Sequence, residues 1–212
     1  YKMISLCKDG HVKNEAEIKK FLIEKNISVK EDSSQVELVA KLFHFHYQRL
    51  KSPIEAIKKC ARGNGGAPKI KGKYSALAIT PEGVVGMCKG KPLGCMLLPD
   101  KAYFSSESAG PWSFVDPVVS SNFSEYWIDI KPGEILEVKR DGTVNRDNFK
   151  TTKEVCSFEW AYFSRPSSVI YGKEVGEVRR RIGKLIAPHL IEDIKKSGGN
   201  LDNCIVAPVL QS

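Results

Sequence analysis

Residues 156–166 have the sequence Cys156-Ser157-Phe158-Glu159-Trp160-Ala161-Tyr162-Phe163-Ser164-Arg165-Pro166. Aromatic side chains recur at every second position from Phe158 to Tyr162, which is the period of a β-strand with one buried face. Pro166 disfavours helical backbone angles at Arg165 and so favours an extended exit. The stretch therefore predicts a buried strand over residues 154–163 that continues in an extended segment.

On the N-terminal side of this stretch, apolar residues alternate with a period of two over several short segments. Turn residues separate them, for example Pro81-Glu82-Gly83 and Asp141-Gly142. We expect two of the segments to form a hairpin around Lys131-Pro132-Gly133, namely 126–130 and 134–139. The other strands predicted in this region are 74–80, 84–88, 94–98 and 102–105.

Three capping signatures precede this alternating region and predict helices. Each has Asn or Ser at the helix start and Glu three residues later. They are Asn14 with Glu17, Ser34 with Glu37, and Ser52 with Glu55. Helices first and a meander of strands afterwards indicate an α+β fold rather than a doubly wound sheet.

Both ends of the chain add further elements. We expect Lys2–Cys7 to be a strand of the sheet. Apolar residues at helical spacing from Val175 onward predict a long final helix, in which Pro188 can introduce a kink. Residues Ile205–Val209 predict one short buried strand.

The composition limits the classes of function. The 212 residues are 42% hydrophobic with a formal charge of +8, and no apolar run reaches the ~18 residues of a membrane span. The six cysteines form no C-x-x-C pair, which favours a reducing, cytoplasmic compartment. The basic clusters lack interleaved stacking aromatics, so we expect neither a nucleic-acid nor a membrane partner.

The segment 156–166 resembles the hinge of amidophosphoribosyltransferases, which link a glutaminase domain to a phosphoribosyltransferase domain. Further motifs resemble that family in the same order along the chain, and Ile205–Val209 resembles the first core strand of its second domain. These motifs are Gly72-Lys73-Tyr74-Ser75, Lys91-Pro92-Leu93, Ser106-Glu107-Ser108, and Pro132-Gly133-Glu134-Ile135 followed by Asp141-Gly142.

The resemblance implies a class II glutamine amidotransferase of the N-terminal-nucleophile hydrolase type. Its fold is α+β, a four-layer αββα sandwich of two antiparallel sheets between helix layers. Residues 1–152 would form the amidotransferase-like domain without its N-terminal part. Residues 153–212 would form the hinge, long helix and first strand of an incomplete phosphoribosyltransferase-like domain. The implied function is hydrolysis of glutamine to supply ammonia for purine nucleotide biosynthesis.

In that family an N-terminal cysteine attacks glutamine, and an Asn side chain with the following Gly N–H stabilises the oxyanion. The oxyanion motif falls on Asp9, Gly10 and Asn14, so a carboxylate replaces the Asn donor. The residue that holds the ammonium of glutamine is an Asp in the family and Gln35 here. Residue 1 is Tyr, so the resemblance places no catalytic nucleophile in this chain. Asp9, Gly10, Gln35 and Asn14 are therefore the predicted oxyanion-hole and substrate-binding positions.

The other candidate residues favour structural roles. Cys156 falls where some family members ligate an iron–sulfur cluster, but a buried thiol is the favoured interpretation. Cys7 is better explained as a half-buried strand residue than as a nucleophile. His44 and His46 are two apart in a predicted helix and do not share a face, so no metal site and no cofactor are expected. Arg165 is interpreted as a salt bridge at the domain junction.

Three interpretations of the function remain open. The chain is a fragment of a glutaminase whose nucleophile lies on another piece, or a catalytically inactive paralogue acting as a structural or regulatory subunit, or an enzyme that reuses the cavity for other chemistry. Whether it is an enzyme is left open. The expected partners are glutamine or a related small molecule, and another copy or a partner subunit that covers the truncated sheet.

Overall fold

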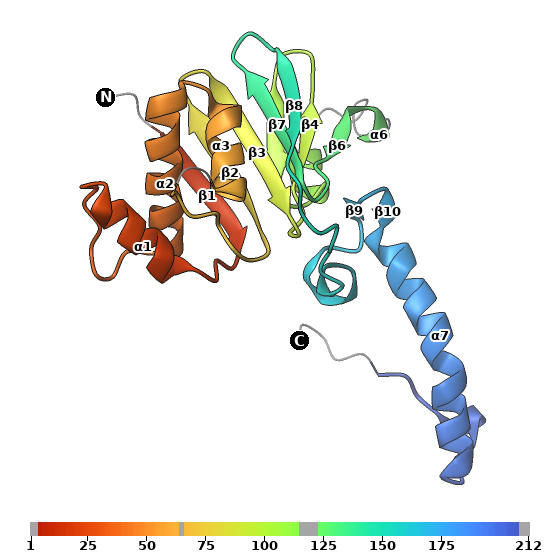
Figure 1. Ribbon diagram of the computed structural model, residues 1–212. Coiled ribbons are helices and arrows are strands. Elements are labelled where there is room, and N and C mark those ends of the chain that lie inside the picture. The colour runs from red at the N-terminus through yellow and green to blue at the C-terminus, as the bar shows by residue number, and fades with distance from the viewer. Residues whose placement is uncertain (1–3, 64–65, 115–122, 208–212) are drawn as a thin grey trace.

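The computed structural model describes residues 4–63, 66–114 and 123–207 (Figure 1). Its centre is a five-stranded antiparallel sheet in the order β1-β2-β3-β7-β8. The strands are β1 (Ser5–Gly10), β2 (Tyr74–Thr80), β3 (Gly83–Lys89), β7 (Glu134–Lys139) and β8 (Val144–Asn148). The strand β1 therefore lies at an edge of the sheet.

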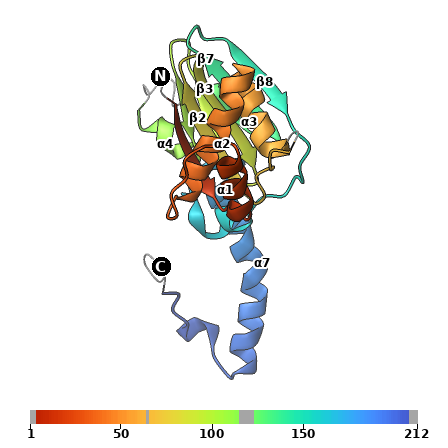
Figure 2. The ribbon, with the colours of Figure 1, turned by 60° about the vertical axis from the view of Figure 1, so that its left-hand side comes forward.

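Three helices cover one face of this sheet (Figures 1 and 2). They are α1 (Glu15–Glu24), α2 (Gln35–Leu50) and α3 (Pro53–Arg62). Their apolar faces form the main core, in which Ile18, Leu42, Phe43 and Ile57 are at most 1% exposed. Burial of side chains of this size contributes about 1.5–3 kcal/mol each, so these helices anchor the sheet.

Two of the three predicted helix caps are confirmed. The hydroxyls of Ser34 and Ser52 accept the N–H groups of Glu37 and Glu55, respectively. The helix predicted after Asn14 also forms, but the Asn14 side chain makes no capping hydrogen bond. Its polar atoms bond a segment distant in sequence instead, as described below.

A second, three-stranded antiparallel sheet packs on the other face of the large sheet. Its order is β5-β4-β6, with β4 (Gly94–Leu97), β5 (Ala102–Ser105) and β6 (Trp127–Asp129). A separate apolar cluster that includes Cys95, Ile130 and Leu136 lies between the sheets. The short helices α4 (Ala109–Trp112) and α6 (Phe123–Tyr126) adjoin β5 and β6. The α+β prediction is confirmed, with helices, large sheet and small sheet as successive layers. Of the fourth layer in the predicted αββα sandwich, the described residues show only the short helices α4 and α6.

The hairpin predicted over residues 126–139 is wrong. Strand β6 pairs with β4, whereas β7 pairs with β3 and β8, so Lys131–Gly133 carries the chain from one sheet to the other. Gly133 makes this crossing with φ of +94° and donates its N–H to the carbonyl of Cys88. Alternating hydrophobicity reports which face of a strand is buried, but not which strand is its neighbour.

The strand predicted over residues 154–163 is also wrong. Residues Glu159–Phe163, labelled η1, form one turn of π-helix, closed by a hydrogen bond from the N–H of Ser164 to the carbonyl of Glu159. The aromatic side chains of this segment do not share a buried face, since Phe158, Tyr162 and Phe163 are all more than half exposed. Long-range hydrogen bonds hold the turn, and the local period does not reveal them.

The C-terminal part leaves the sandwich. After the short strands β9 (Val169–Ile170) and β10 (Lys173–Glu174), the long helix α7 (Val175–Lys196) projects away from both sheets (Figure 1). The long-helix prediction is confirmed, with Pro188 inside it. A short 3-10 helix, η2 (Leu201–Asn203), follows. No helix of the described residues is long and apolar enough to cross a membrane.

The final predicted strand is not formed in the part that the structure describes. Ile205 and Val206 are more than 90% exposed and have no strand partner, and the rest of that prediction falls at 208–209, outside the described residues. The strand predicted over Lys2–Cys7 begins at Ser5, and residues 1–3 also lie outside the described ranges. The division into domains at 152/153 stays a prediction.

Candidate functional site

A cavity of about 210 Å³ lies beside the edge strand β1, between the two sheets. Its walls come from the ends of β1 and β2 and from the β5 region of the small sheet. The lining residues are Cys7, Lys8, Asp9, Ser75, Ala76, Leu77, Leu93, Phe104, Ser105 and Ser106. Among the predicted site residues, Asp9 is the one that lines this cavity directly.

Asp9 and Gly10 form a closed local structure at the end of β1. The Asp9 carboxylate oxygen Oδ1 accepts the backbone N–H of Gly10 at 2.6 Å. The ammonium of Lys8 donates to the Gly10 carbonyl at 2.7 Å. The Gly10 N–H, which the resemblance predicts to be an oxyanion donor, therefore already has an acceptor.

Gly10 is held in a conformation that requires glycine. Its φ is +93°, and an added Cβ would lie 2.3 Å from the carbonyl oxygen of Lys73. The adjacent N–H of His11 donates to the same carbonyl at 3.0 Å. The backbone between β1 and α1 is therefore pressed against the start of β2, because a side chain is absent at position 10.

Gln35 does not line this cavity. As the first residue of α2, it binds the chain between β1 and α1. Its amide nitrogen donates to Glu15 at 2.6 Å and lies 3.1 Å from Nδ1 of His11, and its amide oxygen accepts the N–H of Val12 at 3.0 Å. The side chain at the predicted ammonium-binding position is therefore engaged with the chain's own residues.

Asn14 also binds the protein itself. Its amide donates to the carbonyl of Lys69 and accepts the N–H of Lys71, at 2.9 and 2.8 Å. The amide also donates to Glu17 at 2.9 Å. Asn14 therefore fastens the start of α1 to the segment that leads into β2, which explains why it is not a helix cap.

The cysteines and histidines form no metal centre in the described part of the chain. No group of three or more His, Cys, Asp or Glu side chains there could hold a metal ion. Cys7 is exposed on β1 and reaches the cavity, whereas Cys156 is half-buried just before the π-helical turn. The assignment of Cys156 to an iron–sulfur position stays a prediction.

Glu107 is a structural residue that sequence reasoning missed. It lies in the motif Ser106-Glu107-Ser108, yet its role depends on residues about sixty positions later. One carboxylate oxygen of Glu107 accepts the backbone N–H of Arg165 at 2.8 Å and the hydroxyl of Ser168 at 2.6 Å. At this junction the backbone of Arg165, rather than its guanidinium, makes the contact. The salt bridge predicted for Arg165 is not found among the described residues.

Lys91 and Glu159 form the ion pair that joins the π-helical turn to the sandwich. Their charged atoms are 2.7 Å apart, and the side chains are 20% and 10% exposed. Burial opposes the charge of Lys91, but the hydrogen bond and charge of Glu159, with a smaller contribution from Asp9, raise its pKa. Lys91 therefore stays charged beside the predicted oxyanion position.

Arg179 supports the same turn from the other side. Its guanidinium donates to the carbonyls of Trp160 and Ser164 at 2.8 and 2.7 Å. Arg179 is the first residue of the basic run Arg179-Arg180-Arg181. Carbonyl groups freed by the π-helical turn are thus satisfied by a side chain of α7.

Two other cavities lie on the junction side. One of about 510 Å³ is lined by residues 131–134, 148–151, 153, 155 and Tyr171, and one of about 190 Å³ by residues 128–130, 134–136 and 146–148. Neither contains a predicted site residue. We therefore assign the candidate site to the cavity of about 210 Å³ at Asp9, on chemical grounds rather than on volume.

Comparison with known proteins identifies relatives of the expected kind. No protein-family model matches the chain. It is 28% identical over 203 residues to the amidophosphoribosyltransferase of Methanocaldococcus jannaschii, covering 87% of this chain and 40% of that protein. It is 27% identical over 214 residues to the protein of that name from Bacillus subtilis, covering 97% and 40%. The chain thus spans about two fifths of the length of these relatives.

A solved structure gives the same result for the fold. Glutamine phosphoribosylpyrophosphate amidotransferase from B. subtilis, complexed with ADP and GMP, superposes with a TM-score of 0.67 at 24% identity, covering 87% of this chain and 38% of that one. The resemblance inferred from residues 156–166 and the accompanying motifs is confirmed. The expected α+β fold is shared with that structure as well.

Proposed function

We propose that this chain is an amidophosphoribosyltransferase-like glutamine amidotransferase module of purine nucleotide biosynthesis, which binds glutamine or a related small molecule but does not hydrolyse glutamine with the residues described. The observation that carries the proposal is the hydrogen bond between the Asp9 carboxylate and the Gly10 N–H at the cavity. This hydrogen bond occupies the Gly10 N–H, one of the two oxyanion donors that the resemblance implies. At the position of the other donor, an Asn side chain in the family, Asp9 places a negative charge.

The chemical consequence follows from the charge that develops in amide hydrolysis. Attack on the glutamine side-chain carbonyl places a negative charge on its oxygen, and preorganised donors must face that oxygen. Loss of one such donor costs about 3–4 kcal/mol in the barrier. A carboxylate in its place adds repulsion. Binding of the ground state requires no such donor, so a ligand site can persist where catalysis does not.

Two roles are compatible with this chemistry. In the first, the chain is a fragment or subunit that works with a nucleophile on another polypeptide segment. In the second, it is a catalytically inactive paralogue with a structural or regulatory role. The Asp9–Gly10 hydrogen bond favours the second role, because a nucleophile supplied from elsewhere would still meet an unsuitable oxyanion site.

The decisive experiment measures glutamate release and glutamine binding by the purified chain. We expect no glutamate release above buffer and measurable binding of glutamine or glutamate by calorimetry. Turnover that disappears in the Cys7→Ala variant would instead make Cys7 a nucleophile and overturn the inactive assignment. Intact mass measurements of the native protein and its partners distinguish the two roles, because a partner bearing an N-terminal cysteine supports the first.

A further inference from the structure

A separate cavity of about 300 Å³ lies among the three helices on the far side of the large sheet. Its walls carry cationic and aromatic side chains from α1, α2 and α3. The aromatic, cationic and histidine residues of its lining are Phe21, Lys25, Phe45, His46, Arg49 and Lys59. None of them lines the cavity at Asp9.

Each helix contributes one cation to this cavity, the helical cavity. They are Lys25 from the end of α1, Arg49 from α2 and Lys59 from α3. No carboxylate of the described residues lies within ion-pairing distance of these three cations, although the surface is otherwise rich in ion pairs. The helical cavity therefore concentrates positive charge without internal neutralisation.

Arg49 contacts Phe45 through both its guanidinium group and a hydrogen bond. Its guanidinium carbon lies 3.6 Å from the centroid of the Phe45 ring, and one of its nitrogens donates to the Phe45 carbonyl at 3.1 Å. The ammonium of Lys25 similarly lies 5.6 Å from the centroid of the Phe21 ring. Stacking of this kind holds the cations above the aromatic wall, and the outer N–H groups of Arg49 remain available to a ligand.

His46 lies in the wall of the helical cavity. It is 5% exposed, and its Nε2 atom is buried without a hydrogen-bond partner among the described residues. The ring meets Phe45 edge to face at 5.3 Å, so aromatic packing rather than polar contact surrounds it. Because Nε2 has almost no accessible surface, a ligand in the helical cavity does not contact it, but the ring is close enough to respond to charge bound there.

A purely structural explanation is that the three cations neutralise the C-terminal ends of the helices. Lys25, Arg49 and Lys59 lie at or near the C-terminal turns of their helices, where the macrodipole attracts positive charge. Each dipole contributes only about half a negative charge, however, so three unit cations leave the helical cavity net positive.

We propose that the helical cavity binds the phosphate group of a small phosphate-bearing ligand, with Lys25, Arg49 and Lys59 neutralising the phosphate beside the buried ring of His46. A dianion with several acceptor oxygens suits three cations that approach from three helices better than a single carboxylate does. Burial, together with Lys59 and Arg49, lowers the pKa of His46 to about 4. The imidazole is therefore neutral near neutral pH, and the negative charge of a bound phosphate will raise its pKa.

The test follows the histidine ring signals by ¹⁵N NMR while inorganic phosphate replaces chloride at constant ionic strength. We expect a saturable shift of the His46 signal and an increase of its pKa, with no such response to acetate. Phenyl phosphate is the second probe, because tighter binding than inorganic phosphate assigns a role to the aromatic wall. Equal binding of both probes places recognition in the phosphate group alone, and either outcome supports the proposal.

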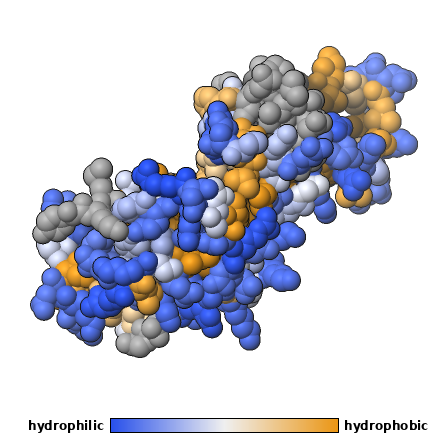
Figure 3. Space-filling model, turned by 90° about the horizontal axis from the view of Figure 1, so that it is seen from above, coloured by the Kyte–Doolittle hydropathy of each residue, from blue (hydrophilic) through white to orange (hydrophobic). Residues whose placement is uncertain are grey.

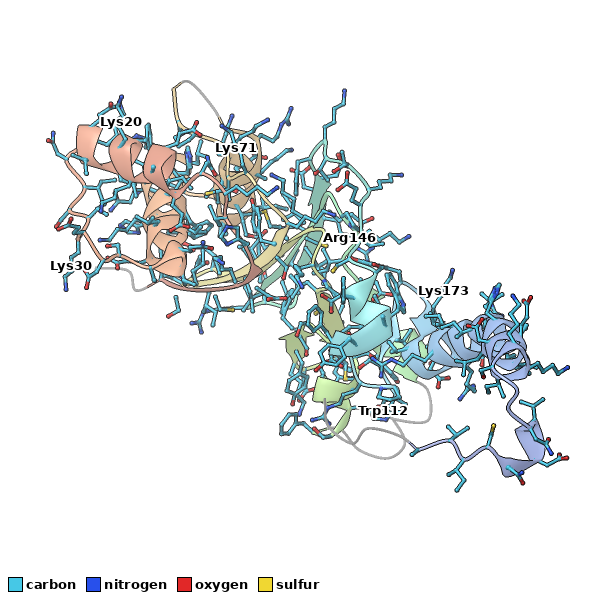
Figure 4. All side chains as sticks on the ribbon, turned by 90° about the horizontal axis from the view of Figure 1, so that it is seen from below. Lys20, Lys30, Lys71, Trp112, Arg146 and Lys173 are labelled. Carbon is cyan, nitrogen blue, oxygen red and sulfur yellow. The ribbon has the colours of Figure 1, made fainter. Side chains whose placement is uncertain are left out.

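Matched variants locate the binding. Lys25→Gln and Lys59→Gln should each weaken phosphate binding about tenfold. Lys20→Gln is the control, since Lys20 is an exposed cation on the same helix as Lys25 but outside the helical cavity (Figure 4). Circular dichroism checks that each variant is folded. Absence of a saturable phosphate response, an equal response to acetate, or equal weakening by Lys20→Gln would overturn the proposal.

Discussion

The carboxylate of Asp9 accepts the backbone N–H of Gly10 at 2.6 Å, and this hydrogen bond closes the end of β1 beside the candidate cavity. An Asn side chain at position 9 could present N–H donors to a ligand, whereas the carboxylate can only accept. The difference of one functional group therefore removes a donor at this position and adds a negative charge beside the cavity.

The Asp9→Asn variant should bind glutamate more tightly than the wild type, by about tenfold. Removal of the carboxylate eliminates repulsion of the γ-carboxylate of glutamate. Glutamine, which is neutral at that position, should gain less. Calorimetry with both ligands measures the difference, and Asp100→Asn on the exposed β4–β5 turn is the control for net charge. No change in affinity for either ligand would show that Asp9 does not face a ligand site. The double variant Asp9→Asn with Gln35→Asp extends the test to the predicted ammonium-binding position.

The Gly10→Ala variant should lose about 2–4 kcal/mol of the free energy of unfolding. Two causes act together, because φ is +93° and the new Cβ would lie 2.3 Å from the carbonyl oxygen of Lys73. Gly142→Ala is the matched control, since Gly142 has a φ of +84° but no atom within 4 Å of an added Cβ. We expect the control to lose only the backbone contribution, about 1 kcal/mol. Urea unfolding that gives equal losses would contradict the close approach at Gly10.

The Lys91→Met variant should destabilise the protein by about 3 kcal/mol, because it leaves the Glu159 carboxylate, 10% exposed, without its cation. Glu159→Gln should cost less, since its amide oxygen still accepts from Lys91. The double variant should recover part of the loss. Denaturant unfolding of the two single variants and the double variant gives the coupling energy. Strict additivity would mean that the pair does not hold the π-helical turn.

Stability should fall between pH 6.5 and 4 because of His46, whose pKa drops from 6.5 to about 4 through burial and the nearby charges of Lys59 and Arg49. Within this window the unfolded chain binds a proton that the folded chain excludes. The free energy of unfolding therefore decreases as the pH falls, by on the order of 3 kcal/mol in total. Above pH 6.5 the contribution is complete, since His46 is neutral in both states.

Thermal unfolding as a function of pH measures this dependence. His46→Gln should flatten the profile in that window, whereas His44→Gln, two positions away on α2 and less buried, should not. Asp147 does not mask the effect. Its hydrogen bond to Lys58 lowers its pKa below 3.8, so its own contribution is lost at lower pH. An unchanged profile in His46→Gln would contradict the assignment.

The open edge of β1 should pair with a strand from outside the described meander. In the described residues β1 pairs with β2 on one side only, and an unpaired edge exposes backbone groups to other chains. Figure 3 shows several apolar patches among hydrophilic residues on one face of the molecule. Sedimentation velocity should detect a dimer or a complex with a partner. A single monomeric species at micromolar concentration, with no partner in a native pull-down, would refute the prediction.

Local sequence was sufficient for most of the elements. The capping serines at positions 34 and 52, the alternating segments and the turn glycines specify helices and strands through contacts within a few residues, and these predictions are confirmed. The motifs around Phe158 likewise indicated the related family, because a shared fold preserves residue types at matching positions. Local sequence did not reveal which groups the side chain of each predicted site residue would contact.

Tertiary structure alone decided the pairing of β6 with β4, the π-helical turn at Glu159 and the contacts of Asn14 and Gln35. The strand predicted over residues 154–163 failed because Arg179, Lys91 and Glu107 supply hydrogen bonds and charge to that region across long stretches of chain. Likewise, the helical cavity unites cations from three helices. Periodicity and capping depend on neighbours in sequence, whereas these features depend on groups that meet only after the layers have packed.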